Sequence, residues 1–483
     1  MYLGIDLGTS GVKAALMDEA QVIVASATAP VSVSRPVAGW SEQDPADWIA
    51  ATEAAIAALR GDHRERLAAV RAIGFSGQMH GATLLDAGDR VLRPCILWND
   101  TRSHAEAALL DANPTYRAIS GNIVFPGFTA PKLHWVKKNE PDVFADVTKV
   151  LLPKDYLRLW MTGEHVSEMS DASGTSWLDV GARQWSPQLL AETHLSVDHM
   201  PRLIEGSEPG GVLRRELAMA WGMSNDVTVA GGAGDNAATA IGLGTVADGA
   251  AFLSLGTSGV IFAANSAFRP DPDSAVHTFC HAVPGLWHQM GVILSATDAL
   301  NWFAGITGQT PATLTAELGE TLSAPGPLFL PYLSGERTPH NDAQIRGVLA
   351  GISHRSDRAA ITAAILQGVA FAFRDNLEAL RSTGTTVERL LAAGGGSRST
   401  YWLHVVATAL GVPIDVPAAG DVGAALGAAR LAMLSAVGGD PLALCTTPPV
   451  ERTIEPDAGQ RSAYEDAYGL YRQTYPAIRS TLT

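Results

Sequence analysis

A six-residue segment with the chemistry of a phosphate-binding turn occurs twice in the chain. Residues 7–12 read Leu-Gly-Thr-Ser-Gly-Val, and residues 255–260 repeat the same six letters nearly half the chain later. Each copy lies between two apolar runs, which predicts a strand, a glycine turn and a second strand. Such a turn exposes consecutive backbone N–H groups and small hydroxyls, which hold phosphate without bulky side chains in the way. We therefore expect two facing turns to clamp a phosphate chain through four residues: Thr9, Ser10, Gly256 and Thr257.

The residue before each copy distinguishes the two turns. Asp6 precedes the first copy and Ser254 precedes the second, so only the first offers a carboxylate to a cation. This asymmetry predicts one Mg²⁺ at Asp6, serving one bound nucleotide. The alternative, that Asp6 only forms a turn through its side chain, stays open at this point.

A second carboxylate, Asp235, follows a predicted buried strand at residues 227–231 and precedes an alanine-rich helix. Residues 232–237 spell G-x-G-x-x-A, which also occurs in dinucleotide-binding loops. In such a loop Asp235 would direct a carboxylate at the pyrophosphate, which disfavours that function. We favour the interpretation that the glycines let a substrate hydroxyl approach Asp235, which would act as a general base. An ordinary helix N-cap is the structural alternative.

Two glycine-containing runs in the second half are candidates for binding the nucleoside. Residues 391–397 read as a strand that enters the run 394–397 (Gly-Gly-Gly-Ser), where absent side chains let a flat base and ribose lie against backbone. A tight strand-to-helix turn is the alternative role of these glycines. Residues 420–423 open another alanine-rich helix, where close helix packing explains the glycines as well as ligand contact does. The predicted nucleotide contacts here are Gly395 and Gly396.

Polar residues after two predicted strands suit a polyol or a sugar. The run 76–81 (Ser-Gly-Gln-Met-His-Gly) follows one strand, and the run 98–102 (Trp-Asn-Asp-Thr-Arg) follows another. Dense hydrogen-bonding residues bind hydroxyls, and an indole offers an apolar face to C–H bonds. A buried, satisfied histidine and a capping aspartate are the alternatives for His80 and Asp100. The candidate sugar contacts are Met79, His80, Trp98, Asp100, Arg102, Asp235 and Asn236.

Four residues of the second half raise the question of a bound transition metal: His277, Cys280, His281 and His288. Their spacing and flanking residues match no zinc pattern. We therefore expect side chains on core strands instead of metal ligands.

Composition limits the size and the partners of the fold. The chain has 483 residues and a formal net charge of −15, from 34 Lys and Arg against 49 Asp and Glu. This length predicts two domains, and the acidic balance disfavours nucleic acid or an anionic membrane as a partner. Three scattered cysteines, with an N-terminus that has no apolar signal core, predict a cytoplasmic protein.

The expected elements repeat one plan in each half of the chain. In the first half we expect strands within 1–30, a helix over 46–59, a strand over 70–75 and a hairpin turn at 87–89. In the second half we expect a hairpin over 250–264, helices over 357–380, after 396, after 420 and from 457 onward, and a strand over 389–392. Hairpins followed by alternating strands and helices predict an α/β fold with mixed sheets covered by helices. We therefore expect domains at 1–245 and 246–483, with the turns facing a cleft between them.

Several motifs together resemble the FGGY carbohydrate kinases, a family within the actin-like ATPase superfamily. Residues 127–135 (GFTAPKLHW) look like the first FGGY signature, and residues 77–81 (GQMHG) look like a substrate loop of the family. Residues 334–339 (SGERTP) look like a segment of the family's C-terminal domain. The second FGGY signature is looser around 347–367, where Ala360 stands in place of a polar residue. The resemblance spans essentially the whole chain.

This resemblance implies two ribonuclease-H-like domains that close over Mg²⁺, ATP and a sugar. It implies D-xylulose as the sugar, its terminal hydroxyl as the phosphoryl acceptor and Asp235 as the base. It also implies that Met79, His80 and Asn236 contact the sugar beside Asp235.

Other functions stay open on the sequence alone. Another kinase of the family would act on ribulose, gluconate or glycerol. An actin-like or chaperone-like ATPase would act on a protein, and a non-catalytic sugar sensor is disfavoured because Asp6 and Asp235 are both present. The sequence assigns no role to Lys13, Glu336 or Arg337 and leaves a homodimer open.

Overall fold

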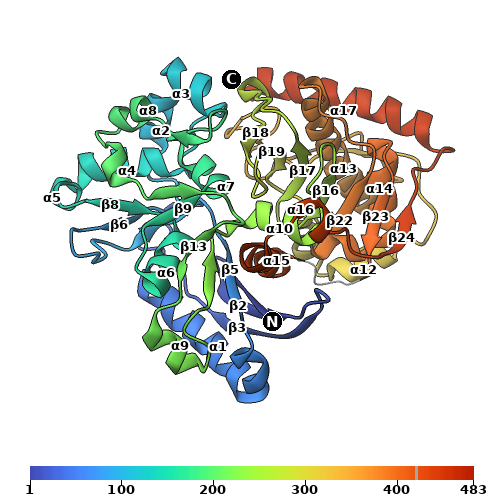
Figure 1. The fold of residues 1–483 in the computed structure, drawn as a ribbon. Coiled ribbons are helices and arrows are strands. Elements are labelled where there is room, and N and C mark those ends of the chain that lie inside the picture. Colours follow the sequence, from blue (N-terminus) through green and yellow to red (C-terminus); the bar gives the residue numbers. More distant parts are fainter. Residues whose placement is uncertain (419–422, 483) are drawn as a thin grey trace.

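The computed structural model describes residues 1–418 and 423–482, and two seven-stranded sheets form its centre (Figure 1). The first sheet has the strand order β13-β14-β5-β1-β2-β3, with β15 beside β5. Its strands are β1 (Tyr2–Leu7), β2 (Gly11–Met17), β3 (Ile23–Pro30), β5 (Ala72–Gly77), β13 (Pro209–Val212), β14 (Thr228–Ala230) and β15 (Ala233–Gly234). Because β1 pairs antiparallel with β2 and parallel with β5, strands distant in sequence end side by side.

The second sheet repeats this pairing. Its order is β18-β19-β17-β16-β22-β23-β24, and β16 pairs antiparallel with β17 and parallel with β22. Its strands are β16 (Ala251–Leu255), β17 (Gly259–Asn265), β18 (His277–Cys280), β19 (Trp287–Ile293), β22 (Leu390–Ala393), β23 (Ile414–Pro417) and β24 (Val450–Ile454). The repeated hexapeptide therefore lies at the same position in two similar mixed sheets.

One face of the first sheet is covered by α1 (Pro45–Ala68), with α6 (Pro153–Thr162) and α9 (Arg215–Trp221) beside that helix. The helix α1 begins after Asp44, whose side chain accepts a hydrogen bond from the backbone N–H of Ala46. Its apolar side chains, including Trp48 and Leu59, are buried in one core with Leu16 of β2. Burial of this apolar surface holds the helix on the sheet, at about 25 cal/mol per Å².

Each half of the chain places one helix on the sheet of the other half. The helix α15 (Ala424–Val437) packs against β1 and β5 of the first sheet. The helix α10 (Asp235–Leu243) packs its Ala240 and Leu243 against Phe252 of the second sheet. Figure 1 shows both helices between the two sheets. They approach closely because Gly427 has no side chain, and a Cβ there would overlap the carbonyl oxygen of Ala238.

The other face of the second sheet carries the largest apolar core, in which Phe371, Trp402 and Tyr471 are buried. The helices that contribute to this side of the second half are α11 (Thr297–Thr307), α12 (Pro311–Ala316), α13 (Arg358–Ser382), α14 (Thr400–Leu410) and α17 (Arg461–Leu482). The short α16 (Pro441–Leu444) follows α15.

Residues between β5 and β13 form a smaller region with its own core, in which Tyr116, Leu133 and Trp177 are buried. Its helices are α2 (His104–Asp111), α3 (Pro114–Ser120), α4 (Thr129–Asn139), α5 (Pro141–Ala145), α7 (Met169–Ala172) and α8 (Pro187–Glu192). Two-stranded sheets pair β4 (Glu42–Gln43) with β7 (Cys95–Ile96), β6 (Thr83–Leu85) with β8 (Lys149–Leu151), β9 (Val166–Glu168) with β12 (Arg202–Ile204), and β10 (Leu178–Asp179) with β11 (Gln184–Trp185). In the second half, β20 (Leu328–Leu330) pairs with β21 (Val348–Ala350).

Most predicted elements are confirmed, with two differences and one region that cannot be compared. The helix expected over 46–59 continues to Ala68, with non-helical angles at His63 (φ −132°, ψ 38°). The hairpin expected at 87–89 is only a turn, because β6 pairs with β8 and only an isolated bridge joins Leu85 to Val91. Apart from Gly423, the glycine-containing run 420–423 lies outside the described residues.

The three cysteines, Cys95, Cys280 and Cys445, are free and buried. Among the helices of the described residues, none combines the length and the apolar character that crossing a membrane requires.

Candidate active site

Both copies of the hexapeptide form the predicted hairpin turns. In the first, Leu7 pairs with Val12, and the N–H of Gly8 donates to the carbonyl of Gly11 at 2.9 Å. In the second, the N–H of Gly256 donates to the carbonyl of Ser258 at 3.1 Å. The side chains and remaining amides of each turn lie where β1 or β16 ends.

Strand register brings Asp6 and Asp235 to one edge of the first sheet. Asp6 lies beside Ser76 of β5, and Ser76 lies beside Ala233 of β15, two residues before Asp235. Burial raises the pKa of Asp235 to about 6, and the negative charge of Asp6 acts in the same direction. Burial also raises the pKa of Asp6, although Ser76 and Lys13, which faces Asp6 from β2, oppose this effect. The two carboxylates are therefore near enough to repel one another.

Asp235 is the first residue of α10, and Gly234 occupies the N-cap position. The carboxylate oxygen Oδ1 of Asp235 accepts hydrogen bonds from the Asn236 backbone N–H at 2.7 Å and from Asn236 Nδ2 at 3.0 Å. The N-cap alternative for Asp235 is thus wrong, because the capping position belongs to the residue before it.

The glycine loop before Asp235 has few amides left for a phosphate. The N–H of Gly231 donates to Glu208, the N–H of Gly232 donates to Gly206, and the N–H of Gly234 donates to a serine hydroxyl. A dinucleotide-binding loop needs such amides free to face the pyrophosphate. These bonds agree with our preference against that function.

The predicted sugar loop touches the first hairpin turn. Gln78 donates its backbone N–H to the carbonyl of Leu7 at 2.8 Å, and its Oε1 accepts a hydrogen bond from Thr9 Oγ1 at 3.1 Å. Trp98, which is about half exposed, donates Nε1 to Thr9 Oγ1 at 3.0 Å. Thr9 therefore connects both runs that sequence analysis assigned to the sugar. Gln78 itself was not among the predicted site residues, although its motif was recognised.

Met79 and His80 continue this loop toward Asp235. Met79 packs against Gly234, where an added Cβ would lie 2.9 Å from the Met79 sulfur. His80 has a left-handed φ of 69°, and its ring stacks on Phe128 with 4.5 Å between ring centroids. Burial lowers the pKa of His80 to about 3, so the ring is neutral, and its Nδ1 lies 2.7 Å from the carbonyl oxygen of Gly174.

The strained backbone of His80 is held by the first FGGY-like motif. Its carbonyl oxygen accepts hydrogen bonds from Lys132 Nζ at 2.7 Å and from Thr129 Oγ1 at 3.2 Å. Burial lowers the pKa of Lys132 to about 7. Lys132 was not predicted as a site residue, and its place in the motif at 127–135 was the available signal.

Asp100 and Arg102 engage each other in the interior. Arg102 Nη2 lies 2.7 Å from Asp100 Oδ2, and Arg102 Nη1 lies 2.8 Å from Glu42 Oε1. Asp100 Oδ2 also accepts the backbone N–H of Ser41 at 2.6 Å, and the guanidinium carbon of Arg102 lies 3.6 Å from the centroid of the Trp40 ring. These contacts fix the segment that carries Trp98. Direct contact of Asp100 and Arg102 with a sugar stays a prediction.

Arg337 and Glu336 reach the same region from the second half. The guanidinium of Arg337 lies over the Phe125 ring at 4.4 Å, and its Nη1 lies 3.4 Å from His277 Nε2. Glu336 accepts backbone N–H groups of Arg337 and Leu294 at 2.7 and 3.0 Å, and burial raises its pKa to about 8. Both residues are thus interior groups, and the charge of Arg337 acts on His80 of the sugar loop.

The histidines of β18 and β19 pack as core side chains. His277 lies between Phe125, Phe128 and Phe279, and His288 stacks on Phe262 with 4.4 Å between ring centroids. Within residues 1–418 and 423–482, no group of three or more His, Cys, Asp or Glu side chains is arranged to hold a metal ion.

A cavity of about 610 Å³ adjoins the second hairpin turn. Leu300 and Trp402 form part of its apolar wall, and Asn301 offers a polar group. It collects all four nucleotide contacts predicted in the second half: Gly256, Thr257, Gly395 and Gly396. An adjoining cavity of about 850 Å³ shares Gly395 and Arg398 with it and reaches Thr239 of α10. Thr9 and Ser10 line neither cavity, so a clamp formed by both turns stays a prediction.

The glycines of this region also serve packing. Gly394 has a φ of 85°, and a Cβ on it would lie 2.8 Å from the Leu255 backbone. A Cβ on Gly396 would lie 2.6 Å from the Leu255 side chain. Both interpretations of the glycine run, a tight turn and a nucleotide-binding surface, therefore have support. The glycines pack closely against β16 and also line the cavity.

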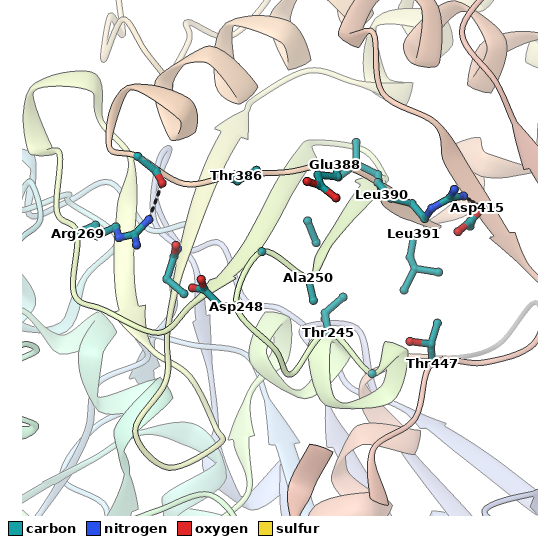
Figure 2. A pocket seen from close by; sticks show the side chains of 16 residues that line it. Thr245, Asp248, Ala250, Arg269, Thr386, Glu388, Leu390, Leu391, Asp415 and Thr447 are labelled. Carbon is teal, nitrogen blue, oxygen red and sulfur yellow. Dashed lines mark hydrogen bonds and ion pairs between the residues drawn. The ribbon is translucent and has the colours of Figure 1, made fainter. Parts of the chain in front are cut away.

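A further hollow of about 570 Å³ lies at the opposite edge of the second sheet, near the starts of β16 and β22 (Figure 2). Figure 2 shows Arg269 and Asp248 on one side of it and Asp415 on the other. Asp415 forms an ion pair with Arg389 at 2.7 Å. None of the predicted site residues lines this hollow. The predicted nucleotide contacts Gly256, Thr257, Gly395 and Gly396 lie beyond the other ends of these strands.

The duplicated sheet, the two hairpin turns and the paired carboxylates define a two-domain phosphotransferase of the actin-like type. The FGGY family of carbohydrate kinases matches along the chain, with its N-terminal domain over residues 1–242 and its C-terminal domain over residues 251–436. The chain belongs to the FGGY family of carbohydrate kinases. The predicted family and fold class are confirmed.

Individual relatives agree with this assignment. The chain is 50% identical over 482 residues to the xylulose kinase of Escherichia coli (strain K12), covering 99% of both proteins. It is 48% identical to the xylulose kinase of Klebsiella pneumoniae over the full length of both. The crystal structure of a xyloylose kinase from Brucella ovis is similar with a TM-score of 0.98 and 64% identity over 99% of both chains.

Proposed function

We propose that this protein transfers the γ-phosphoryl group of ATP to the terminal hydroxyl of D-xylulose, giving D-xylulose 5-phosphate. The observation that carries this proposal is the meeting of Asp235, Asp6, Thr9 and Met79 where β1, β5 and β15 end. The choice of D-xylulose as the substrate rests on the relatives named xylulose kinase, which match the chain from end to end.

Asp235 acts as the general base in this proposal. Its carboxylate orients the sugar hydroxyl and takes the proton as the oxygen–phosphorus bond forms. With burial raising its pKa to about 6, the group is mostly ionised at neutral pH and is still basic enough to accept a proton.

Asp6 suits the magnesium ion that accompanies ATP. Mg²⁺ is usually held by one or two carboxylates together with waters and substrate phosphates, and Asp6 supplies a carboxylate at the end of β1, beside the first hairpin turn. The ion would neutralise charge on the phosphates during transfer. Lys13, opposite Asp6 in β2, adds positive charge on the same side.

The nucleotide is proposed to lie in the cavities of the second half. The base and ribose rest against Gly395 and Gly396, and the phosphates extend past Gly256 and Thr257. Thr9 and Ser10 approach the terminal phosphate from the first turn when the domains, 1–245 and 246–483, close. Closure excludes water and limits wasteful hydrolysis of ATP.

The sugar is proposed to lie between Met79, His80, Trp98, Asn236 and Asp235. A neutral His80 ring and the amide of Asn236 provide hydrogen bonds to hydroxyls, and Trp98 offers an apolar face. The buried pair of Asp100 and Arg102 supports this site through the segment that carries Trp98.

Incubation of the purified protein with D-xylulose, ATP and Mg²⁺ tests the proposal. Mass spectrometry and ³¹P NMR should detect a pentulose 5-phosphate together with ADP. A panel with D-ribulose, gluconate and glycerol tests the sugar preference, and faster turnover of any of them would replace D-xylulose as the substrate. ATP hydrolysis that ignores every sugar and responds to proteins would overturn the kinase assignment.

Asp235→Ala should reduce sugar phosphorylation by at least about a hundredfold, since general bases contribute about 10²–10⁴ to the rate. Binding of an unreactive ATP analogue should stay unchanged. Asp248→Ala is a matched control, because Asp248 lies in the hollow at the far edge of the second sheet.

Two further assignments stay proposals. We propose a cytoplasmic location, which the three free cysteines support because thiols persist in a reducing compartment. A homodimer is the second assignment, and light scattering tests it because this method distinguishes a monomer from a homodimer by mass.

A further inference from the structure

Five charged side chains are fully buried together next to the segment that carries Asp235. Lys154 Nζ lies 2.7 Å from Asp155 Oδ1, 3.0 Å from Asp171 Oδ2 and 3.4 Å from Glu168 Oε1. Arg158 Nη1 lies 3.0 Å from Asp155 Oδ1. All five residues, from α6, β9 and α7, have no exposed side-chain surface, and we name them the α6 charge cluster.

Stability alone is a weak reason for such a cluster. Removing charges from water costs several kcal/mol for each ion, and apolar side chains of the same volume often serve stability as well. Three carboxylates also face only two cations, and burial raises the pKa of Asp171 well above its ordinary range although Lys154 opposes the shift. The contacts that leave the cluster indicate what it holds.

The α6 charge cluster grips the backbone that leads to Asp235. Arg158 donates Nε to the carbonyl oxygen of Ala230 at 3.3 Å and donates Nη2 to the carbonyl oxygen of Gly231. These two residues end β14 and begin the glycine loop. Lys154 packs its Cβ against Gly77, which pairs with Gly234, so the cluster also underlies the start of the sugar loop.

Ser170 makes the last of these connections. Its hydroxyl donates to Glu168 Oε1 at 3.0 Å and accepts the backbone N–H of Gly234 at 3.1 Å. Glu168 also accepts the backbone N–H groups of Ser170 at 2.7 Å and Asp171 at 2.9 Å. Since the hydroxyl proton points at Glu168, a lone pair of the same oxygen is directed at Gly234.

The bond to Gly234 controls the residue that follows it. Gly234 is the N-cap of α10, so its conformation sets the direction in which the Asp235 side chain leaves the helix. Gly234 has no side chain to fix it by packing, and Met79 occupies the space beside its Cα. The Ser170 hydroxyl is therefore a defined restraint on this amide.

We propose that Ser170, oriented by Glu168 of the α6 charge cluster, is a positioning residue that aims the carboxylate of Asp235 at the sugar hydroxyl. This inference rests on the proposed function, in which Asp235 is the base. Ser170 touches neither sugar nor nucleotide in this role and acts only through Gly234.

The variant Ser170→Ala tests the inference. Loss of one buried hydrogen bond corresponds to about a tenfold change, so kcat for sugar phosphorylation should fall about tenfold. The KM for ATP should change by less than about twofold, because the Ser170 hydroxyl bonds to Glu168 and Gly234 and to none of the residues proposed to hold the nucleotide. Ser167→Ala is the matched control, since Ser167 Oγ donates to Asp155 Oδ2 at 2.6 Å and does not touch the loop before Asp235. It should keep kcat within about twofold while losing a comparable amount of stability to urea.

A double-variant cycle separates positioning from general damage. In the Asp235→Ala background, adding Ser170→Ala should change the residual rate by less than about twofold, because no carboxylate is left to aim. An equal loss of kcat in Ser167→Ala, or an undiminished effect of Ser170→Ala without Asp235, would overturn the inference. Full activity of Ser170→Ala would also overturn it while leaving Asp235 as the base. Retained activity of Asp235→Ala would instead remove the proposed base itself.

Discussion

The protonation of Asp235 should set the acid limit of sugar phosphorylation. Burial raises the pKa of this carboxylate to about 6, and a general base works only in its ionised form. At pH 5, one unit below that value, about one carboxylate in eleven is ionised, so kcat/KM should fall to about a tenth of its plateau. Above pH 7 more than about nine in ten are ionised, and kcat/KM should become independent of this group.

Direct measurement of the sugar phosphate by ³¹P NMR between pH 5 and 8 suits this test, because no coupling enzyme contributes its own pH dependence. Sugar and MgATP should both be kept well below their KM values, so that the rate reports kcat/KM and with it the pKa of the ligand-free enzyme. A plateau that extends below pH 5 would refute the reasoning, because it would mean that an ordinary carboxyl or no carboxyl limits the rate.

Two substitutions should move this limit in opposite directions. Asp6→Asn removes the negative charge that raises the pKa of Asp235, so the remaining activity should persist to lower pH. Asn236→Ala removes the hydrogen bond from Nδ2, which stabilises the ionised form, so the limit should move to higher pH. The upward shift should approach about one pH unit, because a hydrogen bond to a charged group contributes about 1.5 kcal/mol and one pKa unit corresponds to about 1.4 kcal/mol. Shifts of the same sign in both variants would contradict this assignment.

Three further predictions concern the supports of the site. Lys132→Met should raise the KM for the sugar about tenfold, because the His80 carbonyl loses the Lys132 donor and keeps only that of Thr129. Initial rates check this, with the exposed Lys138→Met as control. Arg102→Ala should cost about 3–5 kcal/mol of unfolding free energy, because Asp100 stays buried without its cation, although Glu42 keeps its ion pair with Arg93. Urea unfolding measures this loss of stability. The control Arg90→Ala should lose less than about 1 kcal/mol, because Arg90 is exposed in its ion pair with Asp86. Gly427→Ala should cost about 1–3 kcal/mol, because its Cβ would overlap the backbone of α10. Gly469 lies in α17 with open space where a Cβ would stand, so Gly469→Ala should increase the unfolding free energy by at most about 1 kcal/mol. Equal effects of the two glycine substitutions would contradict the close contact between α10 and α15.

Local patterns correctly predicted the positions of the hairpin turns and of the two carboxylates near strand ends, Asp6 and Asp235. The turn at 7–12 is encoded by neighbouring residues, since glycines and alternating apolar side chains need no distant partner to specify it. Asp235 followed a recognisable buried strand, and the observed register brings that strand's end beside Ser76. Features that depend only on neighbouring residues can therefore be predicted before the fold is known.

Contacts between distant segments were not predictable in this way. Asp100 and Arg102 were predicted as sugar contacts because both are polar and follow a strand, and that prediction still stands. Their ion pairs with each other and with Glu42, which is far away in sequence, were not predicted. Ser170 carries no motif, and its relation to Gly234 depends on the packing of α7 against β15. Helix α15 reads as an ordinary alanine-rich helix, and nothing in its own letters indicates which sheet it covers.

Because α10 packs on the second sheet and α15 packs on the first, the two halves of the chain do not form independent domains. A fragment that ends near residue 245 would expose the sheet surface around Gly4 and Gly74. In the intact chain the backbone of α15 packs directly on these two glycines, which leave no room for a side chain. The complementary fragment would keep α15 with no partner and lose α10 from its own sheet. Neither piece would hold its shape in isolation, whereas the two produced together would reassemble, and heating the intact chain should melt both halves in a single transition.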